Sequence, residues 1–399
     1  MTSDFFAGNR SRLASQLDGM LLIISAYGLI QRTNDAAHSF TQESNFWYLT
    51  GINEASWKLI YDGSSGESWL VAPDVSETHR IFEGGISANE AKQISGVKRV
   101  ISSDECIPLM HQLAKKHTLV GTVGPPSHAE YFNFALNPSI LQNRQFLERH
   151  FKSVQDIRSD ISSLRAIKQP SEIMAIQKAV DITARAFEYV HSSIDAYAEE
   201  SAIEAELTYH MRKSGAAGHA YDPIIAAAEH ACTLHYSQNS GKISRKQLIL
   251  MDVGAEYQHY AADITRTYAK GDPTKRQREV HGAVETAHHQ IIKLLEPKLS
   301  VQEYQKAVDS IMSEALKSIG LLADDTSLRK YFPHAVSHGL GIDVHDSLGA
   351  PRYFEENMVL TVEPGIYIPE EGIGVRIEDD ILITKSGHRN LSANLSTGF

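Results

Sequence analysis

The sequence predicts two domains of the α/β (α+β) class, a mixed α/β domain first and a larger domain after it. A chain of 399 residues is longer than one core of average size requires, so two domains are expected from length. In the first part, strand-like segments alternate with helix-like ones, as in a mixed sheet covered by helices. A long amphipathic pattern begins after Pro170. We therefore place the domains at residues 1–160 and 161–399, with the boundary within 156–168.

The N-terminal domain is predicted from short apolar segments rich in β-branched residues, with amphipathic segments between them. The predicted strands are 21–26, 58–61, 68–72 and 119–123. The predicted helices are 88–93 and 105–116.

The C-terminal domain is predicted to begin with a helix at Ser171, because Pro170 prevents the helix from extending backwards. Thr274 has the type of an N-cap, and Gln277 stands three residues later, as in a capping box. The further helices are predicted at 202–214, 274–295 and 301–320. Three histidines of the predicted helix 274–295 are expected on its solvated face: His281, His288 and His289.

Composition indicates an ordinary globular protein with an acidic balance. The chain has 38 basic and 49 acidic residues, a net charge of −11, and no basic cluster suited to nucleic acid. The segment MTSDFFAGNRSR lacks the apolar core of a signal peptide, and no run of about 18 apolar residues exists to span a membrane. The two cysteines do not suggest a disulfide framework. We expect a cytoplasmic protein without nucleic-acid or membrane partners.

The most informative feature of the C-terminal domain is a set of separated residues of metal-ligand type. Four carboxylates and one imidazole carry too much negative charge to cluster without cations. An oxygen-rich set with one histidine suits Mn²⁺ first, with Co²⁺ or Zn²⁺ as alternatives, and two such cations side by side form a hydrolytic site. We therefore predict a dinuclear metallohydrolase. The residues are Asp252, Asp263, His338, Glu363 and Glu378.

Asp252 and Asp263 permit a geometric prediction. Asp252 follows an apolar run and Asp263 precedes a β-branched run, so both are expected on strands. If the chain turns at Tyr257 and Gln258, the two aspartates lie directly opposite on one face, with Cβ atoms about 4.5–5.5 Å apart. Like charges in that position are destabilising unless a shared cation neutralises them. Two solvated strand aspartates are the alternative.

The two glutamates each interrupt an apolar run. Glu363 follows a strand-like run and precedes a Pro-Gly pair, which cannot continue a central strand. Glu378 lies in the apolar segment 374–383, where a carboxylate is costly unless it is paired or bound to metal. Because two more aspartates follow Glu378, a solvated acidic turn is the alternative.

Histidines crowd one glycine-containing segment, PHAVSHGLGIDVHD. Its glycines and β-branched residues argue against a helix, and glycine lets a ligand approach the backbone closely. A lone histidine is more often structural than a ligand, but three in so short a segment favour a functional role. They are His334, His338 and His345.

Together these segments resemble the proline-specific branch of the pita-bread metallopeptidases, which holds aminopeptidase P and Xaa-Pro dipeptidase (prolidase). The resemblance covers about 164–391, through the motifs LRAIKQPSEI, LHYSQNSG, MDVGAEYQHYAADITRTY, PHAVSHGLGIDVHD, TVEPGIYI and VRIEDDILIT. The segments FFAGNRSRLASQL and FTQESNFWYLTGINEAS resemble the N-terminal accessory domain of the same branch. The resemblance thus implies a creatinase/aminopeptidase P-like accessory domain and a C-terminal pita-bread catalytic domain.

Carried over position by position, the resemblance implies two divalent cations held by the five ligand-type residues. Asp263 and Glu378 would bridge the cations, and Glu363 would also accept a proton from the attacking water. Tyr367 and Arg376 would support the ligand carboxylates, a task that matters because ligand orientation is part of catalysis.

The resemblance also implies how the substrate is held. His235 and His345 would hold the scissile carbonyl and stabilise the tetrahedral intermediate, and His334 would line the pocket for the proline ring. Substrates would be small peptides with proline at the second position, where the ring leaves no N–H at the cleaved nitrogen. The family further implies a homodimer.

The choice between a dipeptidase and an aminopeptidase depends on Arg352. A dipeptidase must recognise the free carboxylate of the terminal proline, and the planar fork of arginine suits that task. Arg352 lies in the segment where prolidases place such an arginine, so Xaa-Pro dipeptidase is the first hypothesis. The alternatives are aminopeptidase P, with Arg352 an exposed loop residue, and a non-catalytic peptide-binding module. A mononuclear iron site with two histidines and one carboxylate does not fit the acid-rich set.

Overall fold

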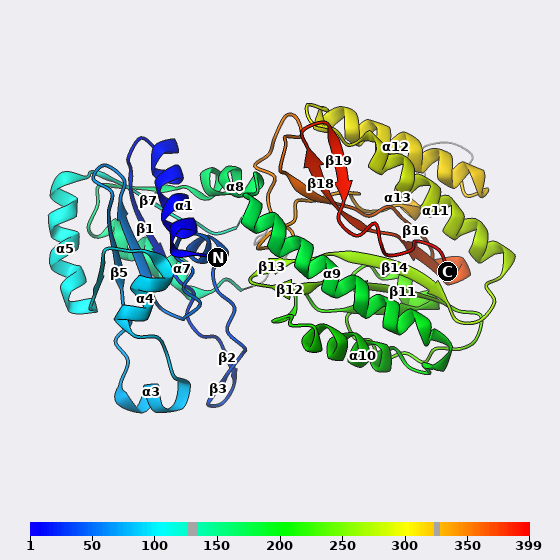
Figure 1. Cartoon of the computed structure of the whole chain (residues 1–399), viewed down its shortest axis with the longest axis horizontal. Coiled ribbons are helices and arrows are strands. Elements are labelled where there is room, and N and C mark those ends of the chain that lie inside the picture. The colour runs from blue at the N-terminus through cyan, green and yellow to red at the C-terminus, as the bar shows by residue number, and fades with distance from the viewer. Residues whose placement is uncertain (127–134, 323–327) are drawn as a thin grey trace. The chain divides into compact units, whose positions relative to one another are not determined.

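The computed structural model describes residues 1–126, 135–322 and 328–399, and the chain divides into two compact units (Figure 1). Unit 1 comprises Met1–Leu164 and unit 2 comprises Arg165–Phe399. Helix α8 (Arg158–Ala166) runs across this division. Each unit contains a buried apolar cluster, so each has a core of its own.

Unit 1 is built on a six-stranded mixed sheet in the order β6-β5-β4-β1-β7-β8. β4 is antiparallel to β1 and β5, and the remaining neighbours are parallel. The predicted strands are confirmed as β1 (Leu21–Ser25), β4 (Lys58–Asp62), β5 (Glu67–Val71) and β7 (Leu119–Thr122). The edge strands β6 (Arg99–Ile101) and β8 (Ser153–Asp156) escape prediction, because they are short and only partly buried.

Helices cover this sheet, and two of them carry a clear start signal. The predicted helices are confirmed as α4 (Ala88–Ser95) and α5 (Ser103–Lys116), each opened by a capping box of serine and glutamate. Helix α1 was not predicted, because its polar residues Asn9 and Arg10 face inward and donate to backbone oxygens of α2 at 2.8 and 2.6 Å. The other elements are α1 (Ser3–Gln16), α2 (Ser44–Thr50), α3 (Glu77–Glu83), α7 (Pro138–Glu148), β2 (Gln31–Thr33) and β3 (Ala36–Ala37).

Unit 2 contains small antiparallel sheets in the orders β10-β11-β14, β13-β12-β9, β15-β18-β19 and β16-β17. The backbone N–H of Glu378 donates to the carbonyl of Thr265 at 3.0 Å and so connects the first of these sheets to the loop before β18. The strands are β9 (Gly218–His219), β10 (Ile224–Ala227), β11 (Leu248–Val253), β12 (Ala255–Tyr257), β13 (Tyr260–Ala261), β14 (Ile264–Ala269), β15 (Val359–Val362), β16 (Gly365–Ile368), β17 (Ile373–Arg376), β18 (Asp379–Thr384) and β19 (Gly387–Asn390).

The long helices of unit 2 pack on these strands in two pairs, α9 with α10 and α11 with α12 (Figure 1). The predicted starts are confirmed, with proline in the first turn of α9 and a capping box of Thr274 and Gln277 before α11. The helices are α9 (Pro170–Ser192), α10 (Glu200–Lys213), α11 (Lys275–Leu294), α12 (Val301–Ser318) and α13 (Leu328–Tyr331), with short 3-10 turns η1 (Ile194–Ala196), η2 (Ala228–Cys232) and η4 (Pro369–Glu371).

The histidines of α11 differ from the prediction. His281 and His288 are buried, 3% and 0% exposed, whereas His289 is exposed as expected. His281 and His288 stand at helical spacing from the buried residues Val284 and Ile291. This periodicity, and not side-chain polarity, decides which face of the helix is buried.

The hairpin between the two aspartates also differs from the prediction. Asp252 pairs with Thr265 instead of Asp263, and the turn is made by Gln258 and His259, whose φ angles are 50° and 66°. Two positive φ angles are the mark of a tight type I′ hairpin, so the predicted register is wrong by two residues. Because side chains alternate with a period of two, an error of two leaves both aspartates on the same face.

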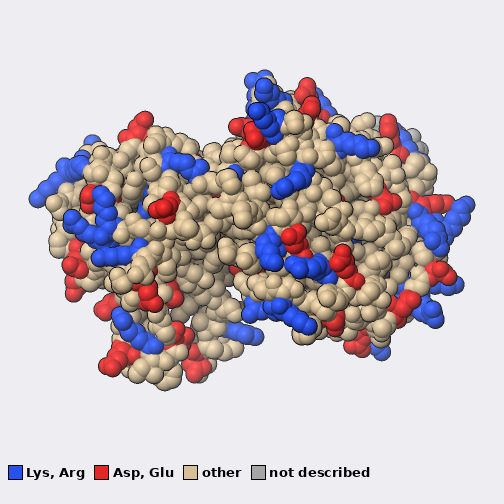
Figure 2. Space-filling view, in the orientation of Figure 1, with Lys and Arg blue, Asp and Glu red and all other residues tan. Residues whose placement is uncertain are grey.

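The surface agrees with the mixed charge of the sequence. On the face drawn in Figure 2, basic and acidic side chains are interspersed, and neither sign forms a broad patch. Among the described helices, none has both the length and the apolar character needed to cross a membrane.

Candidate metal centre

Strand ends bring the acidic candidates to one place in unit 2. Asp252 lies near the end of β11, and Asp263 lies between β13 and β14. Glu363 follows β15, and Glu378 lies between β17 and β18. Because β11 pairs with β14, β15 pairs with β18, and Glu378 is bonded to the backbone of Thr265, these ends converge.

Three of the candidate ligands are within mutual reach. One ligand atom each of Asp263, His338 and Glu378 lies within 4.8 Å of the other two. Nε2 of His338 is 3.5 Å from Oδ2 of Asp263 and 3.5 Å from Oε1 of Glu363. Asp263 and Glu378 are only 5% and 2% exposed, so bulk water cannot screen their charges.

Tyr221 joins the two aspartates, and sequence analysis missed it. Its hydroxyl oxygen is 2.5 Å from Oδ1 of Asp252 and 2.6 Å from Oδ1 of Asp263. A phenol carries one proton, so it can donate to only one of these carboxylates at a time. Burial, reinforced by the aspartate charges, raises the pKa of Tyr221 well above its ordinary value, which keeps it a neutral donor.

The buried carboxylates repel one another. Burial and then the negative charges of Asp263 and Glu363 raise the pKa of Glu378 well above its ordinary value. Burial also raises the pKa of Glu363 to about 7, against the opposing charge of His338. Burial disfavours the charged form of His338, but Asp263 and Glu363 outweigh it and raise the pKa of that imidazole to about 9.

This donor set fits divalent cations. Four carboxylates face one imidazole and one guanidinium, that of Arg376, which forms an ion pair with Asp252. Within the described ranges, the buried Oδ1 of the neighbouring Asp380 has no hydrogen-bond donor. Oxygen-rich sets with one histidine bind Mn²⁺, Co²⁺ or Zn²⁺. Such cations would provide the positive charge that the surrounding side chains lack.

His338 is oriented to bind a metal through Nε2. Its Nδ1 is 3.0 Å from the carbonyl oxygen of Gly339 and so carries the proton. Without a metal, Nε2 carries a second proton that faces Asp263 and Glu363, and a bound cation would take the place of that proton. A backbone carbonyl on the far nitrogen is a common way of fixing the tautomer of a ligating histidine.

Arg376, Tyr367 and His334 form a hydrogen-bonded chain beside the acidic set. Nη1 of Arg376 donates to the hydroxyl of Tyr367 at 2.8 Å, while its Nη2 contacts Asp252. Nδ1 of His334 donates to the carbonyl of Ala335 at 2.7 Å, so its Nε2 accepts the proton of Tyr367 at 2.8 Å. Burial lowers the pKa of His334 to about 4, so this ring is neutral at pH 7.

The ring of His345 packs edge-on against the ring of His338, with centroids 4.3 Å apart and ring planes at 70°. His345 is therefore next to the acidic centre. The carboxylate of the next residue, Asp346, is buried and lies 3.0 Å from Nη2 of Arg165 and 3.6 Å from Nζ of Lys168. The loop that carries His345 is therefore tied to the beginning of unit 2, while the imidazole itself stays exposed.

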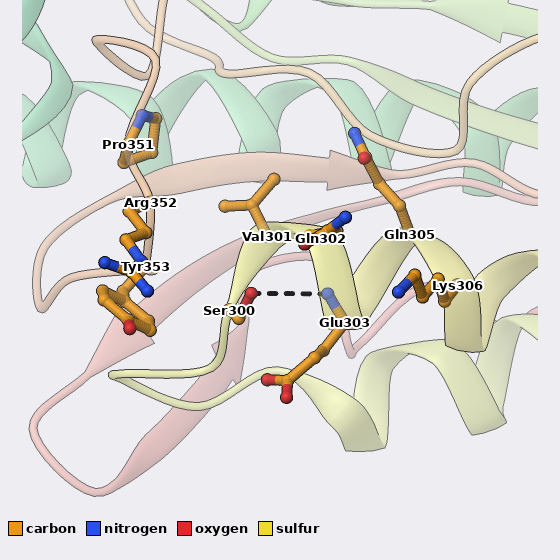
Figure 3. A pocket seen from close by; sticks show the side chains of 9 residues that line it. All are labelled: Ser300, Val301, Gln302, Glu303, Gln305, Lys306, Pro351, Arg352 and Tyr353. Carbon is orange, nitrogen blue, oxygen red and sulfur yellow. Dashed lines mark hydrogen bonds between the residues drawn. The ribbon is translucent and has the colours of Figure 1, made fainter.

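His235 and Arg352 lie outside this network. Neither forms a hydrogen bond or ion pair with the acidic set in the part of the chain that the structure describes. His235 is exposed in the loop after η2. Arg352 is exposed at a pocket of about 550 Å³ beside the start of α12, with its guanidinium carbon 5.2 Å from the ring centroid of Tyr353 (Figure 3).

Comparisons with known proteins extend over nearly the whole chain. The model of metallopeptidase family M24 matches residues 174–385, and that of the aminopeptidase P N-terminal domain matches residues 6–120. Xaa-Pro aminopeptidase of Escherichia coli (strain K12) is 33% identical, covering 98% of this chain and 94% of that protein. Human Xaa-Pro aminopeptidase 3 is 31% identical, and the match covers 91% of this chain and 76% of that protein. The solved low-pH form of Escherichia coli aminopeptidase P has a TM-score of 0.87 at 31% identity. The match covers 100% of this chain and 96% of that one. These matches confirm the expected architecture of an accessory domain followed by a pita-bread domain.

Proposed function

Because this chain belongs to metallopeptidase family M24, we propose that it is an Xaa-Pro aminopeptidase, which removes the first residue from peptides with proline at the second position. The observation that carries the proposal is the buried acidic centre, in a chain similar along its length to proteins named Xaa-Pro aminopeptidase. The first hypothesis from sequence, Xaa-Pro dipeptidase, has less support than its alternative. Arg352, on which that hypothesis depended, makes no contact with the centre among the described residues.

The proposed cofactors are two divalent cations, Mn²⁺ in the first place and Co²⁺ or Zn²⁺ as alternatives. When bound, such cations lower the pKa of a coordinated water and polarise the scissile carbonyl. Tyr221 and Arg376 would fix the orientation of the ligand carboxylates that they contact. The proposed ligands are Asp252, Asp263, His338, Glu363 and Glu378.

Glu363 is the proposed general base. As a carboxylate beside the proposed cations, Glu363 would lie within reach of the water that they activate and could accept its proton. Its side chain is 17% exposed and so can reach a water molecule, whereas Glu378 is almost fully enclosed. The proton that Glu363 accepts from water can then pass to the proline nitrogen, which leaves as a secondary amine.

The proposed proline pocket would be lined by His334, whose ring is backed by the buried rings of Phe332 and Tyr367. The centroid of the neutral His334 ring is 5.6 Å from that of Phe332 and 5.5 Å from that of Tyr367. A pyrrolidine ring offers carbon surface and no N–H, so an apolar wall suits it. His345 and His235 would hold the scissile carbonyl, and the acidic groups of the centre would receive the free α-amino group of the substrate.

The proposal extends to the organisation and setting of the protein. Residues 1–160 would form the accessory domain and residues 161–399 the catalytic domain. The protein would act as a homodimer in the cytoplasm on small peptides, without nucleic-acid or membrane partners.

The test follows the release of alanine from Ala-Pro and from Ala-Pro-Ala by the Mn²⁺-loaded protein. The proposal expects cleavage of the tripeptide and little of the dipeptide, with chelated protein and Asp263→Asn inactive on both. Release from Ala-Pro alone would return the assignment to a dipeptidase, and Arg352→Ala would then be the next variant. Metal-dependent release from neither peptide would reject the specificity for proline.

A further inference from the structure

One buried carboxylate holds both ends of the loop that carries His235. The loop spans residues 227–241, and the carboxylate belongs to Glu200, the first residue of α10, which is 0% exposed. None of the candidate metal ligands is among its hydrogen-bonding partners in the described structure. Glu200 therefore serves the loop and not the acidic centre.

Glu200 accepts four hydrogen bonds from this loop. Oε1 accepts from the backbone N–H of Ala227 at 2.8 Å and from Nδ1 of His230 at 2.8 Å. Oε2 accepts from the hydroxyl of Tyr236 at 2.8 Å and from the backbone N–H of Gly241 at 2.6 Å. A carboxylate offers about four acceptor positions, so all of them are used. Hydrogen bonds to an ionised acceptor are also stronger than neutral ones.

The donors lie on both sides of His235 in the chain. His230 precedes it and Tyr236 follows it immediately, and their rings stack with centroids 4.4 Å apart. Leu234 and Tyr236 pack against the apolar cluster that contains Tyr367. The residues on both sides of His235 thus turn inward, while the imidazole between them is exposed.

A second residue of helix α10, Glu204, also binds this loop, one helical turn after Glu200. Oε2 of Glu204 accepts from Nδ2 of Asn239 at 2.9 Å, and Oδ1 of Asn239 accepts from the backbone N–H of Ile225 at 2.9 Å. Gly241 permits the close approach of the loop, because a Cβ there would lie 2.7 Å from Oε2 of Glu200. The loop is therefore fastened to a rigid helix at several points.

We propose that Glu200 is a positioning residue for His235, and that it fixes the loop so that the imidazole meets the scissile carbonyl. This role rests on the proposed function, which assigns that contact to His235. Glu200 takes no part in bond breaking. A displacement of about 1 Å at a positioning group can cost about 10²-fold in rate. Loss of the anchor should therefore lower kcat without removing the metal.

The test begins with Glu200→Gln, which keeps the shape of the side chain but presents an amide donor to two of the four donors. We expect kcat for Ala-Pro-Ala to fall about 10²-fold, with the bound Mn²⁺ content unchanged. Glu206→Gln is the matched control on the same helix, because Glu206 pairs only with His210 at 2.9 Å among the described ion pairs. It should keep the kcat of the wild type.

A double-variant cycle separates positioning from general damage. If Glu200 acts through His235, the protein with Glu200→Gln and His235→Ala should be no slower than His235→Ala alone. Losses that multiply in the double variant would overturn the inference. So would a wild-type kcat in Glu200→Gln when His235→Ala is impaired.

Amide hydrogen exchange keeps the test independent of peptide cleavage. In Glu200→Gln we expect faster exchange at Ala227 and Gly241, with β11 and β14 still protected. If the wild type cleaves neither peptide, or if His235→Ala is unimpaired, the proposed function of His235 fails. The positioning role then fails with it, while unchanged exchange across residues 227–241 would overturn the anchor itself.

Discussion

At the scale of single residues, the buried carboxylates of the acidic centre should affect stability in a direction that depends on whether metal is bound. The hydroxyl of Thr265 donates to Oε2 of Glu378 at 2.6 Å, but Asp263 and Glu363 face the same carboxylate with like charge. Without cations this arrangement opposes folding, because buried like charges have no solvent to separate them. With cations the same charges become ligands.

We expect Glu378→Gln to raise the free energy of unfolding of the metal-free protein at pH 7 by about 1–3 kcal/mol, the usual cost of a buried polar group that is not satisfied. The neutral amide removes the repulsion and can still accept from Thr265. The variant should lose the stabilisation that Mn²⁺ gives the wild type by binding the folded state. Urea unfolding with EDTA and with Mn²⁺ measures both effects. The exposed Glu356→Gln should change neither by more than about 0.5 kcal/mol, and a metal-free Glu378→Gln weaker than wild type would contradict the prediction.

Sequence reasoning could find the acidic set because each member interrupts an apolar run in its own segment. It could not find Tyr221, whose carboxylate partners lie 31 and 42 residues away and leave no local pattern. Glu200 is hidden for the same reason, since its partners lie in a loop that begins 27 residues later. Such residues are defined by the fold, not by their neighbours in the chain.

Among the elements, α11 shows how a helix can bury titratable groups. Both ring nitrogens of His288 lack a hydrogen-bond partner among the described residues. Burial lowers the pKa of His288 to about 4, although the carboxylate of Asp379, 3.4 Å away, opposes this and Arg266 adds to it. The folded protein therefore holds this ring neutral.

We expect His288 to weaken the fold as the pH falls. An unfolded histidine has a pKa of about 6.5, so between pH 6.5 and about 4 the unfolded chain binds a proton that the folded protein does not. The free energy of unfolding should fall across this window by up to about 3 kcal/mol. His288→Leu removes this dependence, so urea unfolding from pH 7 to 5 should favour the variant increasingly over wild type. The exposed His289→Leu serves as the control, and a pH-independent difference for His288→Leu would refute the prediction.

The hairpin between the aspartates depends on Gly254. A Cβ at this position would lie 1.7 Å from the carbonyl oxygen of Ala262, which is backbone and cannot yield. We expect Gly254→Ala to cost at least about 3 kcal/mol and to abolish Mn²⁺ binding, because Asp252 and Asp263 flank the clash. Gly282→Ala is the control within α11, because an added Cβ there has no atom of the described residues within 4 Å apart from the backbone of its own helix. It should stabilise the fold by about 0.5–1 kcal/mol. Urea unfolding and metal analysis compare the two, and equal effects would contradict the steric argument.

Element prediction succeeded where periodicity and caps agree, as at α5, α9 and α11. It failed in register at the aspartate hairpin, because Gln258 and His259 lack the Asn-Gly chemistry that marks a type I′ turn. The prediction that both aspartates share a face was still correct, because side chains alternate with a period of two and the register error was two residues.

In the whole molecule, the natural fluorescent reporters and the proposed metal ligands belong to different units. All three tryptophans, Trp47, Trp57 and Trp69, are buried in unit 1. Every proposed ligand lies between Asp252 and Glu378 and therefore in unit 2. Tryptophan emission thus reports on unit 1, while the proposed metal would bind in unit 2.

We expect chelation to lower the midpoint of the thermal transition seen by far-UV circular dichroism. The midpoint seen by tryptophan emission should stay the same, because cations that bind only folded unit 2 stabilise that unit. Adding Mn²⁺ back should restore the first midpoint. An equal shift of the tryptophan midpoint would show that the two units unfold as one cooperative body.

The bond between Glu378 and Thr265 joins residues 113 positions apart, so the acidic centre is complete only after distant segments have met. Distant pairings form late, after the chain has paid the entropy of closing long loops. We therefore expect a cation to bind only after the barrier to folding has been crossed. An interaction that forms after the barrier lowers the unfolding rate and leaves the folding rate nearly unchanged. In stopped-flow experiments, Mn²⁺ should therefore lengthen the lifetime of the folded molecule without hastening its formation.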